Sequence, residues 1–339
     1  MAKLEQGRGV HQLDGTNNEM SLVVTVKNEV KEISALLDSI LTQSDPPQEI
    51  IFVDGGSTDG THEILLERLS GRENTVILQA PESNISQGRN TGIRHASGEI
   101  IAVTDAGCRL DRSWLEVFRK AFRESPSLNC AYGSVYPEAS SAYEECAGVC
   151  SLWRFFGRSE RSASPQGRSL VFRKDAFEKV GGFPEHLYAG EDVLFVEKIR
   201  QAGFKTMYLP EAKVFWRARA NLRGIFNQFR IYARDGIRAK LTTRLYLGPI
   251  SWLSFLALVL VLWLLTRLVI FPLLLATSLV GFLVAKHACY FRITFRWSKR
   301  YRGSFLWLIP VLLALHTGQA IGFIEGFFKR FLIRNPQDQ

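Results

Sequence analysis

Residues 21–61 constrain the fold of this chain more than any other stretch, because they hold two short apolar runs on either side of an amphipathic segment. Residues 22–26 and 49–53 are rich in β-branched side chains, and each run has the length of one buried strand. Between them, apolar residues recur every three or four positions over 33–41, which predicts a helix. Strand, helix and strand in this order predict a parallel pair of strands in an α/β fold.

Polar residues stand at the carboxyl end of each of these strands. Thr25, Asn28 and Glu29 lie at the end of the first strand, and Asp54 opens a glycine-rich turn after the second. In open parallel sheets, ligands bind outside the carboxyl ends of the strands. We therefore expect a nucleotide pocket at this edge of the sheet, with these four residues around it.

The alternation of strands and helices continues to about residue 216. Periodic segments that predict helices lie between further apolar runs, which predict strands at 75–79, 99–104, 131–135 and 169–173. Such an alternation is typical of a mostly parallel central sheet.

The nine residues from Val53 to Thr61 read VDGGSTDGT. Together with the preceding strand that ends in an Asn/Glu pair, they resemble the amino-terminal signature of family 2 glycosyltransferases. The resemblance extends over roughly residues 20–216. It implies a GT-A catalytic domain over residues 21–216, a nucleotide-diphosphate sugar as donor, most commonly a UDP-sugar, and inversion at the transferred sugar.

The resemblance also implies roles around the donor. Asp54 matches the family residue that contacts the base, and an ordinary turn or helix-capping acid is the alternative. Gly88-Arg89-Asn90 resembles the segment beside the donor, so Arg89 is expected to meet phosphate and Asn90 the nucleotide or sugar. A surface arginine is the alternative for Arg89.

A metal ion is implied by the segment that ends the strand at 99–104. Thr104 and Asp105 occupy the place of the family's DxD motif, whose carboxylates bind Mg²⁺ or Mn²⁺. Gly107 stands where the second acid is usual. The expected divalent cation is therefore assigned to Asp105, the substrate's phosphates and water.

Two further groups of residues are candidates for the acceptor side. Glu191 and Asp192 match the family's acidic pair at a helix start, so Asp192 is the expected general base and Glu191 its positioning partner. The alternative is that both acids only favour the helix N-terminus. Trp216, Arg217 and Arg219 are expected to contact the diphosphate or an anionic acceptor headgroup.

The carboxyl-terminal part of the chain predicts membrane helices. Uncharged runs of 19, 18 and 21 residues occupy 247–265, 268–285 and 304–324, and each is long enough to cross a bilayer. We expect two to three transmembrane helices within residues 245–331. A re-entrant or packed third helix is the alternative, because basic residues follow it.

Charge is concentrated next to these runs. The net charge is +9, and residues 217–244 alone carry eight basic residues and one acid, Asp235. Apolar residues in this segment recur at helical spacing, which predicts an interfacial amphipathic helix; a surface helix packed on the catalytic domain is the alternative. The chain has no nucleic-acid-binding motif, so the basic charge is assigned to an anionic membrane surface rather than nucleic acid.

The remaining features predict where the protein works. Residues 1–20 are polar, without the apolar core of a signal peptide, and are expected to be a flexible N-terminus. Five cysteines without metal-site spacing predict reduced, mostly buried thiols. We expect a multi-pass protein of the cell (inner) membrane whose catalytic domain is cytoplasmic.

Taken together, these features predict a glycosyltransferase that moves a single sugar from a nucleotide-diphosphate donor to a lipid or lipid-linked acceptor. One alternative is a non-catalytic or transport-coupled membrane protein that binds nucleotide-sugar. A dinucleotide-dependent oxidoreductase is disfavoured, because the glycines after Asp54 do not have the G-x-G-x-x-G spacing.

Overall fold

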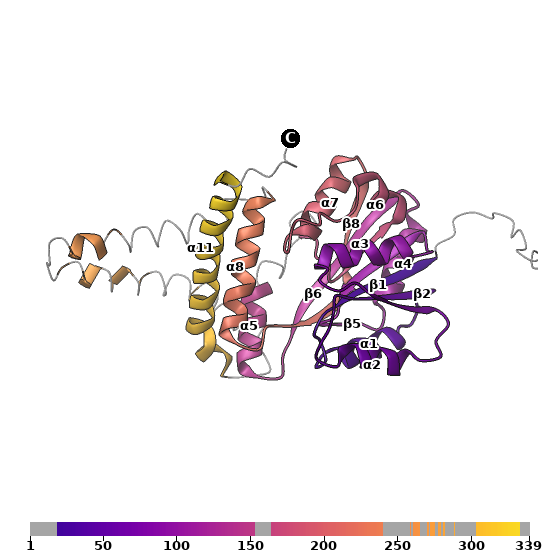
Figure 1. The fold of residues 1–339 in the computed structure, drawn as a ribbon, viewed down its shortest axis with the longest axis horizontal. Coiled ribbons are helices and arrows are strands. Elements are labelled where there is room, and N and C mark those ends of the chain that lie inside the picture. The colour runs from indigo at the N-terminus through magenta and orange to yellow at the C-terminus, as the bar shows by residue number, and fades with distance from the viewer. Residues whose placement is uncertain are drawn as a thin grey trace, which may run out of the picture.

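The computed structural model describes residues 19–152, 164–239 and 303–332, together with isolated residues between 258 and 288. In this part of the chain, one eight-stranded sheet has helices against both faces (Figure 1). Its strands are β1 (Met20–Val26), β2 (Glu49–Asp54), β3 (Thr75–Gln79), β4 (Ile100–Asp105), β5 (Cys108–Leu110), β6 (Leu128–Glu138), β7 (Leu170–Arg173) and β8 (Lys205–Arg217).

The two halves of the sheet differ in strand direction. The strand order is β3-β2-β1-β4-β7-β6-β8-β5. The first four strands run parallel, and β6 is parallel to β8. In contrast, β7 is antiparallel to β4 and β6, and β5 is antiparallel to β8. The predicted α/β fold is confirmed. The sheet, which was expected to be mostly parallel, is mixed, and it is parallel throughout the β3-β2-β1-β4 half.

Alternate residues of each strand face opposite helical layers, as the pleat requires. Leu22 and Val24 belong to one buried core, whereas Val23 between them belongs to the other. The first core packs against α1, α2 and α4, and the second against α3, α6 and α7. These helices are α1 (Ile33–Leu41), α2 (Thr61–Leu69), α3 (Ile85–His95), α4 (Trp114–Glu124), α6 (Lys174–Val180) and α7 (Glu191–Gln201).

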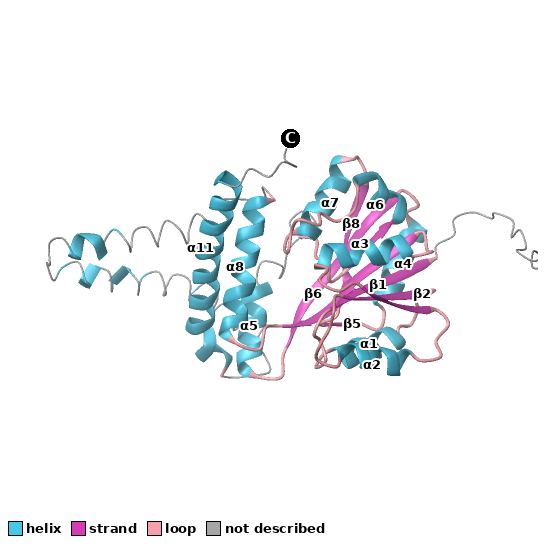
Figure 2. Ribbon diagram, viewed as in Figure 1, coloured by secondary structure: helices cyan, strands magenta, loops and turns pink. Residues whose placement is uncertain are grey.

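A second group of helices stands beside the sheet (Figure 2). It comprises α5 (Ala142–Leu152), α8 (Leu222–Arg238), the short η3 (Ser304–Trp307) and α11 (Leu308–Leu332). Gly318, Gly322 and Gly326 of α11 face α8, and a Cβ on any of them would overlap an α8 backbone carbonyl. Small residues at four-residue spacing allow two helix backbones to approach this closely. The helices α8 and α11 therefore form one tightly packed pair.

The membrane prediction is tested over part of its length. Within the described residues, one helix is long and apolar enough to cross a bilayer, over Ser304–Lys329, with a mean hydropathy of 1.6. The predicted spans at 247–265 and 268–285 fall almost entirely outside the described residues. The described residues therefore contain one candidate for the two to three expected spans.

The segment expected to lie in the membrane interface forms α8, and part of its apolar face is covered by protein. Ile225 and Phe229 are 0% and 8% exposed and belong to the same core as Leu308 and Val311 of α11. Tyr232 of the same helix is 37% exposed. The predicted helix is present, and its place in the membrane interface stays a prediction.

The cysteines follow the expected pattern where they are described. Cys108, Cys130, Cys146 and Cys150 are buried and free, and Cys289 lies outside the described residues. Burial raises the pKa of the Cys130 thiol to about 12, against a smaller opposing effect of Arg200. That thiol is therefore protonated and unreactive at neutral pH.

Candidate active site

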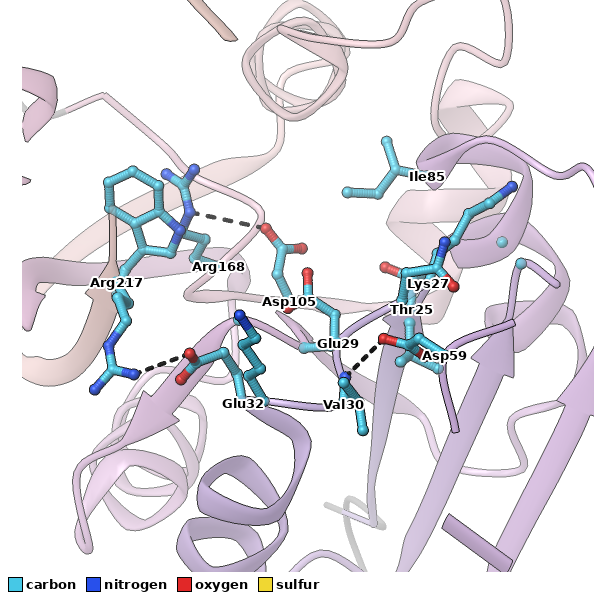
Figure 3. A pocket seen from close by; sticks show the side chains of 18 of the residues that line it. Thr25, Lys27, Glu29, Val30, Glu32, Asp59, Ile85, Asp105, Arg168 and Arg217 are labelled. Atoms are coloured by element: carbon cyan, nitrogen blue, oxygen red, sulfur yellow. Dashed lines mark hydrogen bonds and ion pairs between the residues drawn. The ribbon is translucent and has the colours of Figure 1, made fainter. Parts of the chain in front are cut away.

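A cavity of about 950 Å³ lies at the carboxyl ends of β1, β2 and β4, at the edge of the sheet where a nucleotide pocket was expected (Figure 3). The start of α3 and the end of β8 complete its wall. Seven of the residues predicted from the sequence line it, namely Thr25, Asn28, Glu29, Asp105, Trp216, Arg217 and Arg219. The fold thus brings the ends of β1, β4 and β8 to one opening.

The other six predicted residues do not line this cavity. They are Asp54, Arg89, Asn90, Thr104, Glu191 and Asp192. Two of them belong to the framework behind the wall: the Asn90 side chain bonds both the N–H and the carbonyl of Phe183 at 2.9 Å, and the Thr104 hydroxyl donates to the carbonyl of Arg168 at 2.8 Å. Their contact with a donor stays a prediction.

Asp54 builds the loop that follows it. The side chain is buried, and Oδ1 accepts hydrogen bonds from the N–H of Gly56, from the N–H of Ser57 and from the Ser57 hydroxyl, at 3.1, 2.8 and 2.7 Å. Its other oxygen lies 3.1 Å from Nδ1 of His62. Gly56 and Gly60 have φ angles of 87° and 97°, which favour glycine. The observed partners of the Asp54 side chain are in this loop and the first turn of α2, and its predicted contact with a base stays a prediction.

The loops after β1 and β2 are joined by side chains. Asn28 has a φ of 56°, and its Oδ1 accepts from the N–H of Thr58 at 2.8 Å. Asp59 accepts from the N–H of Val30 at 3.1 Å, as drawn in Figure 3, and the N–H of Glu29 donates to the hydroxyl of Thr61 at 2.8 Å. These bonds fix the floor of the cavity.

Arg89 unites two acids that are far apart in the sequence. Its guanidinium lies 2.6 Å from Oδ1 of Asp105 and 2.7 Å from Oε1 of Glu191, and its side chain is 1% exposed. Gly167 packs directly on this guanidinium, where a Cβ would overlap it. Burial alone would lower the pKa of Arg89, but the two carboxylates outweigh burial and raise it. In the structure, Arg89 holds the end of β4 next to the start of α7, and its predicted phosphate contact stays a prediction.

The acidic pair opens α7 after Gly190, whose φ is 78°. Burial raises the pKa of Glu191 and Asp192 raises it further, against the effect of Arg89. Asp192 is half-buried, and its two oxygens accept from the N–H groups of Gly167 and Val193, both at 2.7 Å. Asp192 therefore lies beside Glu191, at the edge of the cluster that Arg89 forms with Asp105 and Glu191 (the Arg89 cluster).

Glu29 faces the position where the metal-binding motif lacks its second acid. A Cβ built on Gly107 would lie 3.7 and 3.8 Å from the two carboxylate oxygens of Glu29. In Figure 3, the Glu29 and Asp105 side chains point toward one another in the middle of the pocket. Burial raises the pKa of Glu29 to about 7, while Arg219 lowers it and Asp105 raises it. Glu29 thus brings a carboxylate close to the space that an acid at position 107 would fill.

Arg168 is a charged cavity residue that the sequence reasoning missed. The Arg168 guanidinium stacks 4.4 Å from the Trp216 ring centre, donates to the hydroxyl of Tyr232 at 3.2 Å, and has Nε 3.9 Å from Asp105. Beside it, Arg217 bonds Glu32 at 2.9 Å. Arg168 sits just before the strand β7, in no motif, and only the assembled fold places it near Trp216.

Comparison with known proteins agrees with this geometry. The model of glycosyl transferase family 2 matches residues 21–168, and that of glycosyl transferase family group 2 matches residues 100–316. The chain belongs to glycosyl transferase family group 2. The predicted likeness to family 2 is confirmed over residues 21–168, and the chain carries a glycosyltransferase domain.

Two relatives come from the archaeon Haloferax volcanii. Its "Glycosyltransferase AglE" is 31% identical over 195 residues, which cover 56% of this chain and 64% of that protein. Its "Glucosyl-dolichyl phosphate glucuronosyltransferase" is 23% identical and is matched over 54% of this chain and 64% of its own length. The chain thus spans slightly under two thirds of these relatives.

A solved structure shares the fold over nearly the whole chain. The mannosyltransferase PcManGT from Pyrobaculum calidifontis, in complex with GDP-Man and Mn²⁺, superimposes with a TM-score of 0.62 at 18% identity. The match covers 94% of this chain and 88% of that one. The likeness confirms a GT-A-like fold for this family member.

Proposed function

We propose that this protein is an inverting glycosyltransferase that moves a single sugar from a nucleotide-diphosphate donor to a lipid or lipid-linked acceptor. The observation that carries the proposal is the Arg89 cluster, which joins Asp105 at the cavity wall to Glu191 beside Asp192. Arg89 thereby holds a donor-side acid next to an acceptor-side acidic pair. Glu191 of that pair lies 102 residues after Arg89 in the sequence.

The donor occupies the cavity at the ends of β1 and β2. Thr25, Asn28 and Glu29 line it there, and the hydrogen bonds between the loops after β1 and β2 fix its floor. Asp54 acts mainly by shaping the loop over which the base lies, since its carboxylate already accepts three hydrogen bonds. UDP-sugars are the first donors to test, because they are the commonest in families that this chain resembles.

The residues present fit a divalent cation. Asp105 and Glu29 would supply oxygen ligands, the donor set that Mg²⁺ and Mn²⁺ prefer, and Glu29 would take the place of the acid that is absent at Gly107. When bound, such an ion neutralises charge on the leaving diphosphate. Arg168 adds a fixed positive charge on the same side, because its guanidinium is held over Trp216.

The transfer itself needs a base on the acceptor side. Asp192 takes the proton from the acceptor hydroxyl while that oxygen bonds to the anomeric carbon, and the bond from this carbon to the diphosphate oxygen breaks. Attack opposite to the leaving group inverts the configuration. The N–H groups of Gly167 and Val193 orient the Asp192 carboxylate, and Arg89 keeps Glu191 in place beside it.

The acceptor approaches from the side of α8 and β8. Trp216, Arg217 and Arg219 line the cavity there and suit an anionic headgroup. We place this side against the cytosolic face of the membrane, with α11 and the segments at 247–265 and 268–285 as anchors. The named activity of one relative on a dolichyl phosphate supports an acceptor of this chemical class.

Two measurements test the proposal. Thermal unfolding of the purified protein with a panel of nucleoside diphosphates, with and without Mn²⁺, is expected to show stabilisation by one nucleotide that increases with the metal. Incubation of the matching nucleotide-sugar with lipid extract should then yield a glycosylated lipid. Equal glycosylation of soluble acceptors contradicts the lipid acceptor, and binding without donor consumption favours the non-catalytic alternative.

A further inference from the structure

The one acid in the basic segment 217–244 has a structural position that the proposed function does not explain. Asp235 lies on α8 and is 0% exposed. Its Oδ2 accepts a hydrogen bond from the backbone N–H of Tyr188, 47 residues away, at 2.9 Å. Arg234 lies 2.7 Å from Oδ1 and Arg238 lies 3.5 Å from the same oxygen.

Tyr188 belongs to the loop that leads into the acidic pair. This loop runs from Phe183 to Gly190, where α7 begins with Glu191 and Asp192. Helix α3 holds its beginning, because Asn90 bonds the backbone of Phe183 and Asn84 donates to the carbonyl of Glu185 at 2.6 Å. Asp235 holds its end from the opposite side. Tyr188 itself is 62% exposed and lines the cavity.

Helix α8 is in turn fixed to α11, which stands alongside it (Figure 1). The three glycines of α11 allow direct backbone contact with α8, and Arg230 of α8 pairs with Glu325 of α11 at 2.7 Å. A movement of this helix pair relative to the sheet therefore acts on Asp235 and, through Tyr188, on the loop before Asp192.

We infer that Asp235 is a positioning residue that ties the α8–α11 helix pair to the loop carrying Glu191 and Asp192. Its carboxylate sets the Tyr188 backbone, and with it the placement of the acidic pair at the acceptor side of the cavity. The inference rests on the proposed role of Asp192. The competing explanation is that Asp235 only neutralises Arg234 and Arg238, which are 18% and 22% exposed.

The test uses the full-length protein in detergent or vesicles, with Asp235→Ala, Asp235→Asn and two controls. Glu325→Gln breaks an ion pair of the same helix pair, and Arg238→Ala breaks an ion pair of Asp235, while both leave the Tyr188 bond intact. Hydrogen exchange over residues 183–190 reports the contact without any need for activity. Steady-state transfer, with donor KM and kcat measured separately, reports its consequence.

We expect Asp235→Ala to speed exchange in this loop and to lower kcat, each by about tenfold to a hundredfold, which is the range for losing a hydrogen bond to a charged group. Donor KM should not change, because the donor side of the cavity does not contact Asp235. Asp235→Asn keeps an oxygen acceptor and should recover most of both effects. Both controls should match the wild type.

Three outcomes overturn the inference: unchanged loop exchange in Asp235→Ala, an equal loss of kcat in Arg238→Ala, or an equal loss in Glu325→Gln. If Asp235→Ala does not fold, Asp235→Asn is used in its place. A neutral amide oxygen accepts a weaker hydrogen bond from the Tyr188 N–H than the carboxylate does. Hydrogen exchange over residues 183–190 must then be faster in Asp235→Asn than in Arg238→Ala, and equal exchange overturns the inference. If the wild type transfers no sugar, the proposed function fails, and the exchange measurement still judges the contact itself.

Discussion

The two sides of the cavity wall are built from contacts of very different range. At the Asp54 side, the carboxylate bonds backbone groups two and three residues away, so the loop carries its own shape. At the Arg89 side, one guanidinium bonds acids that are 16 and 102 residues away. The side-chain partners of Asp54 lie within the turn after β2 and the first turn of α2, whereas the Arg89 cluster joins residues of β4, α3 and α7.

This difference sets how each side responds to damage. A local loop that loses one acceptor can relax around the loss, with water replacing the missing bonds. In the Arg89 cluster, Arg89 and Glu191 are buried, and the guanidinium compensates two acids at once. Breaking a buried ion pair by removing one partner leaves the other charge uncompensated, which costs more than the pair itself contributes.

The largest expected effect is therefore that of Arg89→Met. Removing the guanidinium leaves Glu191 and Asp105 without their common partner, and we expect a loss of about 3–5 kcal/mol in the free energy of unfolding. That corresponds to a fall of roughly 10 °C in the unfolding midpoint, measured by intrinsic fluorescence.

Arg94→Met, on the same helix, is the matched control, because its side chain is 63% exposed and lies 3.6 Å from Glu185. It should cost no more than about 0.5 kcal/mol. Equal losses for the two variants would show that the Arg89 cluster is not a distinct unit of stability.

Asp54→Ala is expected to have a smaller effect. It removes a carboxylate that accepts three hydrogen bonds inside one loop, and we expect about 2 kcal/mol of destabilisation. The unfolding midpoint should fall by about half as much as in Arg89→Met. Glu63→Ala, an exposed change on α2, serves as control and should have no measurable effect. If Asp54→Ala lowers the free energy of unfolding as much as Arg89→Met does, the distinction between the local contacts of Asp54 and the long-range contacts of Arg89 is contradicted.

The smallest of these effects concerns the metal. Glu29→Gln should weaken the stabilisation by Mn²⁺ and nucleoside diphosphate, with the apparent metal affinity falling about tenfold, because one charged ligand is lost. The metal-free protein should melt at the wild-type temperature or above it, since burial already disfavours the Glu29 charge.

Gly107→Asp sharpens this test, because the space beside Glu29 admits a Cβ at ordinary contact distance. In the double variant Glu29→Gln/Gly107→Asp, the acid is moved from one position to the other, and metal affinity should return toward the wild-type value. Glu32→Gln, which changes a cavity acid paired with Arg217, is the control. No recovery in the double variant would remove Glu29 from the metal site.

The strand-end residues could be predicted from the sequence because their signals are local. A run of β-branched residues followed by Asn28 and Glu29, or by Asp54, fixes both the strand and the edge where these residues emerge. Asp105 could be placed at the same edge for the same reason. The likeness to known families then followed from the order of these segments.

The partners across the site could not be predicted in this way. Nothing near Arg89 in the chain indicates that it bonds Glu191, and nothing near Arg168 indicates that it stacks on Trp216, since both contacts depend on how the elements pack. The apolar face of α8 shows the same limit. Its periodicity indicates an apolar face but does not indicate that Ile225 and Phe229 pack in one core with α11.

The central claim is that the acidic pair beside the Arg89 cluster performs sugar transfer, and its most direct test is the rate of donor turnover in Asp192→Asn. This substitution keeps the size and the hydrogen-bonding oxygen of the side chain but removes its basicity. We predict that transfer falls by about 10²- to 10⁴-fold while nucleotide binding is retained. Glu197→Gln, a change on the same helix at a side chain 45% exposed, should keep wild-type turnover. Turnover in Asp192→Asn equal to that of the wild type would contradict the account.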